Sequence, residues 1–158
     1  MKKVLGLIML LFLTCNSYGK GLFAPDFSLK DENGKIVHLY DLKGNIVMLS
    51  FCSTHCKKCK KILPEINRIY NKYKDKGVKA FIVVIDTDDI NKIRDFKRKL
   101  GINIPCLIGT DEVLKRYRIL GTPSIFVLNR ELRFGLILLG LKDPKLIEKR
   151  IKKLLEEK

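Results

Sequence analysis

Residues 46–59 are IVMLSFCSTHCKKC, an apolar run followed by a short polar segment and by two cysteines that two lysines separate. The continuous apolar run predicts a central strand that is covered on both faces. From Cys56 onward the apolar residues recur with helical spacing. The stretch therefore predicts a strand, a short loop and a helix, with Cys56 at the helix start and Cys59 one turn further in.

This position gives the two cysteines a defined chemistry. Residues three apart on a helix are neighbours, close enough for Cys56 and Cys59 to bridge. The first sulfur faces free backbone N–H groups and the positive end of the helix dipole, and Lys57 and Lys58 add positive charge nearby. In Cys-x-x-Cys motifs the thiol pKa falls from about 8.5 to roughly 3.5–7.5. We expect Cys56 to attack a substrate disulfide and Cys59 to resolve the mixed disulfide, or the pair to run the reverse reaction.

The segments around this unit alternate between strands and helices. Upstream, residues 25–40 predict a short hairpin. Downstream, periodicity and turn residues predict strands over 80–85, 124–128 and 134–139, and helices from 56 to about 76, over 90–100, over 111–117 and from 144 onward, with a kink at Pro64. This order predicts an α/β fold in which a central mixed β-sheet carries helices on both faces and an N-terminal β-hairpin.

The N-terminus has the pattern of a targeting segment. Two lysines at positions 2 and 3 precede an apolar run from Val4 to Leu13, which is too short to span a bilayer as a helix. The small residues Ser17 and Gly19 then fit the site of a signal-peptidase cut.

We therefore expect residues 1–19 to be a signal peptide and residues 20–158 to form one domain. Export would place that domain in the periplasm or at the outer face of the cytoplasmic membrane. Two alternatives stay open, a lipid anchor attached to Cys15 and an uncleaved membrane anchor.

The composition fits a single domain with a basic surface. The 158 residues include 32 Lys and Arg against 17 Asp and Glu, a net charge of +15. The basic residues are spread along helix-like stretches, without aromatic platforms or a nucleic-acid motif, so a nucleic-acid partner is not expected. A solvated lysine-rich surface explains the charge, and attraction to an anionic membrane face or to acidic partner proteins is the alternative.

The cysteines form a cluster and are not spaced like the cysteines of structural disulfide bonds. Apart from Cys15, the chain contains Cys52, Cys56, Cys59 and Cys106, and three of these lie within eight residues. Such clustering indicates a reactive or metal-binding site. Cys52 and Cys106 are either a second redox pair or two small buried apolar residues.

Four motifs follow one another along the chain: residues 24–27 (APDF), the strand at 47–51, the CKKC at 56–59 and the GTP at 121–123. Their order resembles that of exported thioredoxin-like proteins of the TlpA/ResA group, which are related to the AhpC/TSA redoxins. The resemblance covers about residues 23–156. It implies a thioredoxin fold and thiol–disulfide oxidoreductase activity, and we expect neither a cofactor nor a bound metal.

The same resemblance implies roles for the GTP motif and for partners. By it, Pro123 is a cis proline that faces the disulfide, and Thr122 is a substrate contact. Protein thiols and disulfides would be the substrates, as in the reduction of apocytochrome c, with electrons from a membrane-bound donor. The direction of electron flow stays open, because the lysines between the cysteines favour a more oxidising pair.

The chain departs from the family pattern at the site. Family members usually carry Trp where Cys52 and His55 stand, and thioredoxin has a buried Asp where this chain has Ser50. His55 either polarises the neighbouring thiol or fills the Trp site as a half-buried ring.

Two other functions remain as alternatives. A peroxiredoxin-like thiol peroxidase shares the fold, but it needs a Thr three residues before the attacking Cys, where this chain has Ser53. Residues 54–56 are similar to a segment of Sco-like metal-binding proteins. Those proteins use a His further along the chain, but no His follows His55 here. Zinc would have to use Cys52, His55 and the two cysteines of the CKKC motif.

Overall fold

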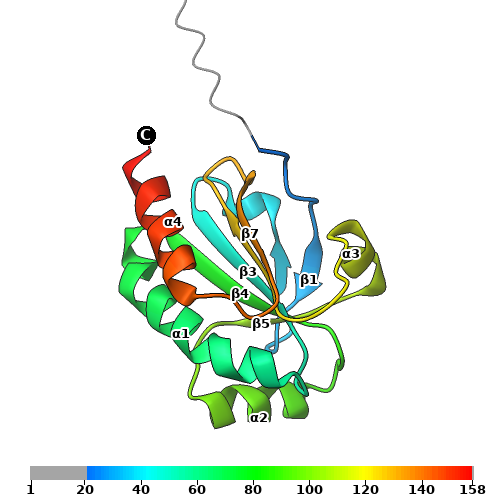
Figure 1. The fold of residues 1–158 in the computed structure, drawn as a ribbon. Coiled ribbons are helices and arrows are strands. Elements are labelled where there is room, and N and C mark those ends of the chain that lie inside the picture. The colour runs from blue at the N-terminus through cyan, green and yellow to red at the C-terminus, as the bar shows by residue number, and fades with distance from the viewer. Residues whose placement is uncertain (1–20, 158) are drawn as a thin grey trace, which may run out of the picture.

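A computed structural model describes residues 21–157, which form a central sheet covered on both faces (Figure 1). The expected signal peptide, residues 1–19, lies outside the described residues, and so does Cys15. The expected domain of residues 20–158 is described except for its first and last residues.

Five strands make up the central sheet in the order β5-β4-β3-β6-β7. β3 (Ile46–Cys52) lies in the middle and runs parallel to β4 (Val78–Val84), which runs parallel to β5 (Cys106–Ile108). On the other side, β6 (Ser124–Leu128) runs antiparallel to β3, and β7 (Phe134–Leu139) runs antiparallel to β6. The sheet is mixed, which confirms the prediction.

Both faces of the sheet carry a packed layer. The apolar sides of three helices share one core with β3 and β4: α1 (Lys57–Tyr73), α2 (Ile90–Leu100) and α4 (Pro144–Glu156). The other core lies under α3 (Asp111–Arg116) and a two-stranded antiparallel sheet of β1 (Ser28–Lys30) and β2 (Ile36–His38). The predicted helices on both faces and the N-terminal hairpin are thus confirmed.

The residues of β3 alternate between the two cores. Met48 and Cys52 belong to the core under α1, whereas Leu49 and Phe51 belong to the core under α3. All seven residues of β3 are buried, which explains why the sequence shows an unbroken apolar run instead of an alternating one. The alternation also directs Cys52 toward α1.

The helix boundaries follow the capping residues. Asp143 accepts a hydrogen bond from the Lys145 N–H at the start of α4, and Asp89 caps α2, which ends at Gly101 with φ 61°. α1 continues through Pro64, and the bend expected there stays a prediction. Two short 3-10 helices, η1 (Tyr40–Leu42) and η2 (Lys74–Lys76), lead into β3 and β4.

Between residues 21 and 157, none of the helices combines the length and the apolar character needed to cross a membrane.

Candidate functional site

Cys56 occupies the tip of α1, directly after the loop that follows β3. It is the N-cap residue of the helix, and its Sγ accepts a hydrogen bond from the backbone N–H of Cys59 at 3.1 Å. The residue is half-buried, whereas Cys59 in the next turn is buried. The expectation that this sulfur faces the amide groups of the first helical turn is confirmed.

Cys59 lies one turn further in and is fully buried. Hydrogen bonding with Cys52 is the largest cause that lowers the pKa of the Cys59 thiol to about 6, against the opposing effect of burial. Cys56, the Ser53 backbone and Thr122 act in the same direction as Cys52.

Cys52 and Cys106 are also buried, on the same face of the sheet. The hydrogen bond to Cys59, together with burial, raises the pKa of Cys52 well above its usual value, and burial raises the pKa of Cys106 to about 12. Both residues therefore keep their protons at neutral pH.

The alternative of a Cys52–Cys106 disulfide does not fit the sheet. Cys52 pairs with Val84 of β4, whereas Cys106 pairs with Ile82 of the same strand, so β4 lies between them. Two strand spacings amount to about 10 Å, beyond the roughly 7 Å limit between Cα atoms in a disulfide. Within residues 21–157 all four cysteines are free thiols.

The segment before β6 brings Thr122 and Pro123 to the cysteines. The Thr122–Pro123 peptide bond is cis, as the resemblance implies. Pro123 is buried and Thr122 is half-buried. Because Ser124 pairs with Phe51 of β3, Thr122 and Pro123 lie near the end of β3 that leads to Cys56.

Asp86, at the end of β4, holds the loop before Cys56. Its carboxylate accepts hydrogen bonds from the Ser53 hydroxyl at 3.0 Å, the Thr54 hydroxyl at 2.7 Å and the Thr54 backbone N–H at 3.0 Å. Partial burial works to raise the pKa of Asp86, but the bonds from Thr54 and Ser53 lower it overall. Sequence reasoning missed this residue, and its only signal was an acid closing a buried strand.

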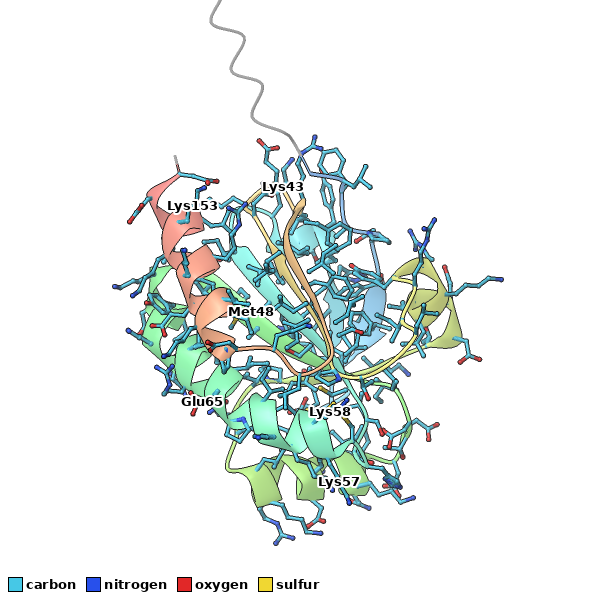
Figure 2. The ribbon with its side chains drawn as sticks, in the orientation of Figure 1. Lys43, Met48, Lys57, Lys58, Glu65 and Lys153 are labelled. Atoms are coloured by element: carbon cyan, nitrogen blue, oxygen red, sulfur yellow. The ribbon has the colours of Figure 1, made fainter. Side chains whose placement is uncertain are left out.

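His55 does not fill the site of a buried ring. Its side chain is 84% exposed, and Nδ1 lies 3.6 Å from the Asp86 carboxylate and 3.2 Å from the Thr54 hydroxyl. The half-buried ring was therefore a wrong expectation, because the side chain extends into solvent and contacts Thr54 and Asp86 at its Nδ1. Lys57 and Lys58 are exposed as well, at the end of the molecule where α1 begins (Figure 2).

Ser50 lies on β3, at the position where thioredoxin has a buried Asp. It is buried, and its hydroxyl finds no hydrogen-bond partner among residues 21–157.

The geometry bears on both alternative functions. Ser53 stands where a peroxidase has the Thr that positions peroxide, but its hydroxyl donates a hydrogen bond to the Asp86 carboxylate instead. In the part of the chain that the structure describes, no group of three or more His, Cys, Asp or Glu side chains converges as metal ligands would.

The arrangement suits thiol–disulfide exchange. An accessible sulfur at a helix tip can attack a disulfide, and a buried sulfur one turn away can displace the partner.

Known proteins carry the same combination of fold and sequence. Residues 21–134 match the AhpC/TSA family. The thiol-disulfide oxidoreductase ResA of Bacillus subtilis is 34% identical over 132 residues, 83% of this chain and 73% of the relative. The solved structure of a putative thiol:disulfide interchange protein DsbE from Chlorobium tepidum is 27% identical, with a TM-score of 0.78 over 86% of this chain and 97% of that one. The thioredoxin domain of a thiol-disulfide oxidoreductase from Bacteroides vulgatus has a TM-score of 0.77 at 25% identity, over 87% and 98% of the two chains.

Proposed function

Because the chain belongs to the AhpC/TSA family, as a thioredoxin-like thiol–disulfide oxidoreductase of the TlpA/ResA group, we propose that Cys56 and Cys59 are its working pair. In this proposal the two cysteines exchange disulfides with protein substrates outside the cytoplasm. The observation that carries the assignment is the hydrogen bond from the Cys59 N–H to the Cys56 sulfur, at the accessible tip of α1.

In the reducing direction the reaction has two steps. The Cys56 thiolate attacks one sulfur of a substrate disulfide, and the other substrate sulfur leaves as a thiolate. Cys59 then attacks the Cys56 sulfur, which forms the Cys56–Cys59 disulfide and releases the second substrate thiolate. The substrate has gained two electrons, and a membrane-bound donor would return the pair to its reduced form.

A polypeptide substrate is supported by the surface next to Pro123. Leu120, three residues before Pro123, is 99% exposed, and Leu139 of β7, which pairs with Ser124, is exposed as well. Exposed apolar side chains on the segment around Pro123 suit contact with an extended segment of another protein. Apocytochrome c is one protein substrate consistent with the family.

The extracytoplasmic location is supported by the sequence of residues 1–19, with its lysines, short apolar run and small residues. A lipid anchor at Cys15 remains the alternative form of attachment. The direction of electron flow follows from the reduction potential of the pair. A value near about −270 mV is typical of a reductase, and one near about −120 mV of an oxidant.

The assignment is tested by substituting the two cysteines in turn. We expect Cys56→Ser to lower the reduction of insulin disulfides at least about 100-fold, because the attacking sulfur is lost. Cys59→Ser should instead accumulate a mixed disulfide on Cys56, visible as a mass increase that a reductant removes.

Cys106→Ala is the matched control, because it removes a buried thiol of the same core away from the helix tip. Its activity should stay close to that of the parent. A Cys56→Ser protein that still reduces insulin at the parental rate contradicts the assignment.

A further inference from the structure

A broad hollow opens at the end of the molecule opposite to the reactive sulfurs. It has a volume of about 600 Å³, and its lining comes from the last turns of α1 and α4, from η2 and from the turn that joins β6 to β7. Of its seven lining residues only Glu156 is acidic, and four are basic: Lys72, Lys76, Arg130 and Lys152. Because α1 has 17 residues and a length of about 25 Å, the hollow is separate from the site at the other end of that helix.

Arg130 is fixed in the hollow by carbonyl groups and not by a carboxylate. Its Nη1 donates hydrogen bonds to the main-chain oxygens of Leu154 at 2.8 Å and Glu157 at 3.0 Å, at the C-terminal end of α4. These oxygens orient the guanidinium without cancelling its full charge. Within residues 21–157 its Nε and Nη2 make no hydrogen bond, so two nitrogens of a planar fork are free for the oxygens of a phosphate.

Two lysines of the hollow are unpaired as well. Lys76 in η2 and Lys152 in α4 are exposed, and among the described residues neither forms an ion pair with a carboxylate. Lys72, in contrast, is paired with Glu148 at 2.6 Å. Together with the guanidinium, the hollow therefore offers three unpaired cations against the exposed carboxylate of Glu156.

Exposed apolar side chains lie against the turn that carries Arg130. Arg133, in the same turn, donates a hydrogen bond to the Gly21 carbonyl at 2.9 Å, and its guanidinium lies 3.5 Å from the centre of the Phe23 ring. Phe23 is 61% exposed and the preceding Leu22 is 80% exposed. Large apolar side chains beside basic ones are typical of surfaces that lie in the interface of a membrane.

The segment before β3 adds an aromatic residue to this end. The Gly44 N–H donates a hydrogen bond to the Arg130 carbonyl at 2.8 Å, which joins that segment to the turn between β6 and β7. Tyr40 is 64% exposed, and the ammonium group of Lys43 lies 5.7 Å from the centre of its ring. Figure 2 shows Lys43 at the same end of the molecule as Lys153. Tyrosine, with its apolar ring and polar hydroxyl, is enriched where a membrane meets water.

We propose that this end of the molecule docks on a membrane that contains anionic phospholipid, with a headgroup phosphate in the hollow beside Arg130. Lysines and arginines are attracted to the negative surface potential of such a membrane. The side chains of Leu22 and Phe23 enter the interfacial layer, where they leave water. An acidic protein would also attract the cations, but the exposed apolar side chains and the apolar run of residues 4–13, which predicts membrane targeting, favour the lipid surface.

The docked orientation directs the start of α1 away from the lipid. Gly21, where the described chain begins, lies on the membrane side, and Cys56 lies beyond it by about the length of α1 (Figure 1). A protein substrate can therefore reach Cys56 without displacing the lipid contact. The inference stands apart from the assignment of the cysteine pair, because no lining residue of the hollow belongs to that site.

The test uses residues 20–158, the domain expected after cleavage. These residues hold all the described strands and helices of both cores, and they lack the apolar run that would enter any bilayer. Binding is measured by sedimentation with vesicles of phosphatidylcholine alone or mixed with phosphatidylglycerol. We expect binding to the anionic vesicles to be at least about tenfold tighter, and to fall at least about tenfold when the salt is raised from about 0.1 M to about 1 M.

A pair of double variants identifies the end that binds. Lys76→Gln with Lys152→Gln removes the unpaired lysines of the hollow and should weaken binding to the anionic vesicles about tenfold. Lys60→Gln with Lys61→Gln changes the net charge equally, at exposed positions near the start of α1, and should leave binding within about twofold of the parent.

The chain contains no tryptophan, so a single introduced one reports on the apolar contact. With Phe23→Trp, the emission should shift to shorter wavelength on anionic vesicles but not on phosphatidylcholine vesicles, because the ring leaves water. Leu120→Trp is the matched control, since Leu120 is 99% exposed and precedes the end of β6 that lies away from Arg130. Its emission should not change on either kind of vesicle.

Equal binding to the two kinds of vesicle overturns the proposal. An equal loss in both double variants overturns it too, because the attraction then belongs to overall charge. If binding of soluble poly-glutamate depends on Lys76 and Lys152 whereas binding of vesicles does not, the partner is an acidic protein and the lipid surface is wrong. A shift in emission with Leu120→Trp and none with Phe23→Trp would place the contact at the opposite end.

Discussion

At the residue scale, Asp86 stabilises the loop that carries Cys56 to the tip of α1. We expect Asp86→Asn to lower the free energy of unfolding by about 1–2 kcal/mol at pH 7, because an amide replaces a carboxylate that accepts three hydrogen bonds. The folded-state pKa of Asp86 lies below its usual 3.8, so its contribution is present above pH 3.8 and is lost as the pH falls through the folded value. Urea unfolding at several pH values measures both effects.

The exposed Asp88, two residues further on, provides the matched control for Asp86. Asp88→Asn should leave the stability within about 0.5 kcal/mol of the parent. Equal losses in the two variants would show that the loop is not held by Asp86.

The positions of Cys56 and Cys59 at the start of α1 were predictable from the sequence, but the contacts that hold the preceding loop were not. Cys56, Cys59 and Pro123 belong to local motifs whose spacing defines the chemistry. Asp86 and Ser53 are 33 residues apart, and only the parallel pairing of β3 with β4 brings them together. The half-buried ring considered for His55 was wrong for a similar reason, because the contact of its Nδ1 with Asp86, 31 residues away, could not be read from the local sequence.

At the element scale, Glu148 links α4 to α1. Its carboxylate bonds to Lys72 at 2.6 Å, to the Tyr73 hydroxyl at 3.0 Å and to Arg68 at 3.4 Å, and its side chain is only 14% exposed. The bond from Lys72, followed by those from Tyr73 and Arg68, lowers the pKa of Glu148 to about 2 although burial opposes the shift. The two helices are thus joined by a carboxylate that stays charged in mild acid.

We expect Glu148→Gln to lower the free energy of unfolding at pH 7 by about 1 kcal/mol, a modest value because Lys72 and Arg68 are half-exposed. A lowered carboxyl pKa stabilises the fold above the ordinary value of 4.5, and the effect disappears as the pH falls through about 2. The variant should therefore lose less stability than the parent between pH 4.5 and pH 2, as thermal unfolding at each pH would show.

Glu65→Gln is the control at this scale, since Glu65 pairs with Arg68 on the same helix and is 50% exposed. Its effect should stay below about 0.5 kcal/mol. A Glu148 variant with the acid profile of the parent would contradict the link between the helices.

The predictability of each element follows from its length and its periodicity. β3, α2, β6, β7 and α4 were expected within a residue or two, because apolar runs, helical spacing and capping residues define them. β5 was missed, because its three residues between Pro105 and Gly109 are too few to show a period. They pair with β4 along the chain, and Leu107 also forms a bridge with Asp31, contacts that are distant in sequence.

At the scale of the whole molecule, the net charge of +15 bears on the choice of substrate. Lys57 and Lys58 lie at the end that carries Cys56, whereas Lys43 and Lys153 lie at the opposite end (Figure 2). We expect an acidic disulfide peptide to be reduced faster than a basic one, and its rate to fall about three- to tenfold between low and high salt, because salt screens the attraction. Initial rates at increasing NaCl concentration measure this dependence.

Two double variants locate the effect on the molecule. Lys57→Gln with Lys58→Gln should remove most of the preference for the acidic peptide, whereas Lys152→Gln with Lys153→Gln changes the net charge equally but should leave it within about twofold. An equal loss in both would assign the preference to overall charge and not to the lysines beside Cys56.

The position of Gly21 has a practical consequence for handling the protein. The chain enters the described structure at the end opposite to Lys57 and Lys58, where α1 begins (Figures 1 and 2). A bead, chip or fluorescent fusion joined to the mature domain directly before Gly21 would therefore lie at the end of the molecule away from Cys56. Immobilised protein could in this way capture disulfide partners with its reactive end unobstructed.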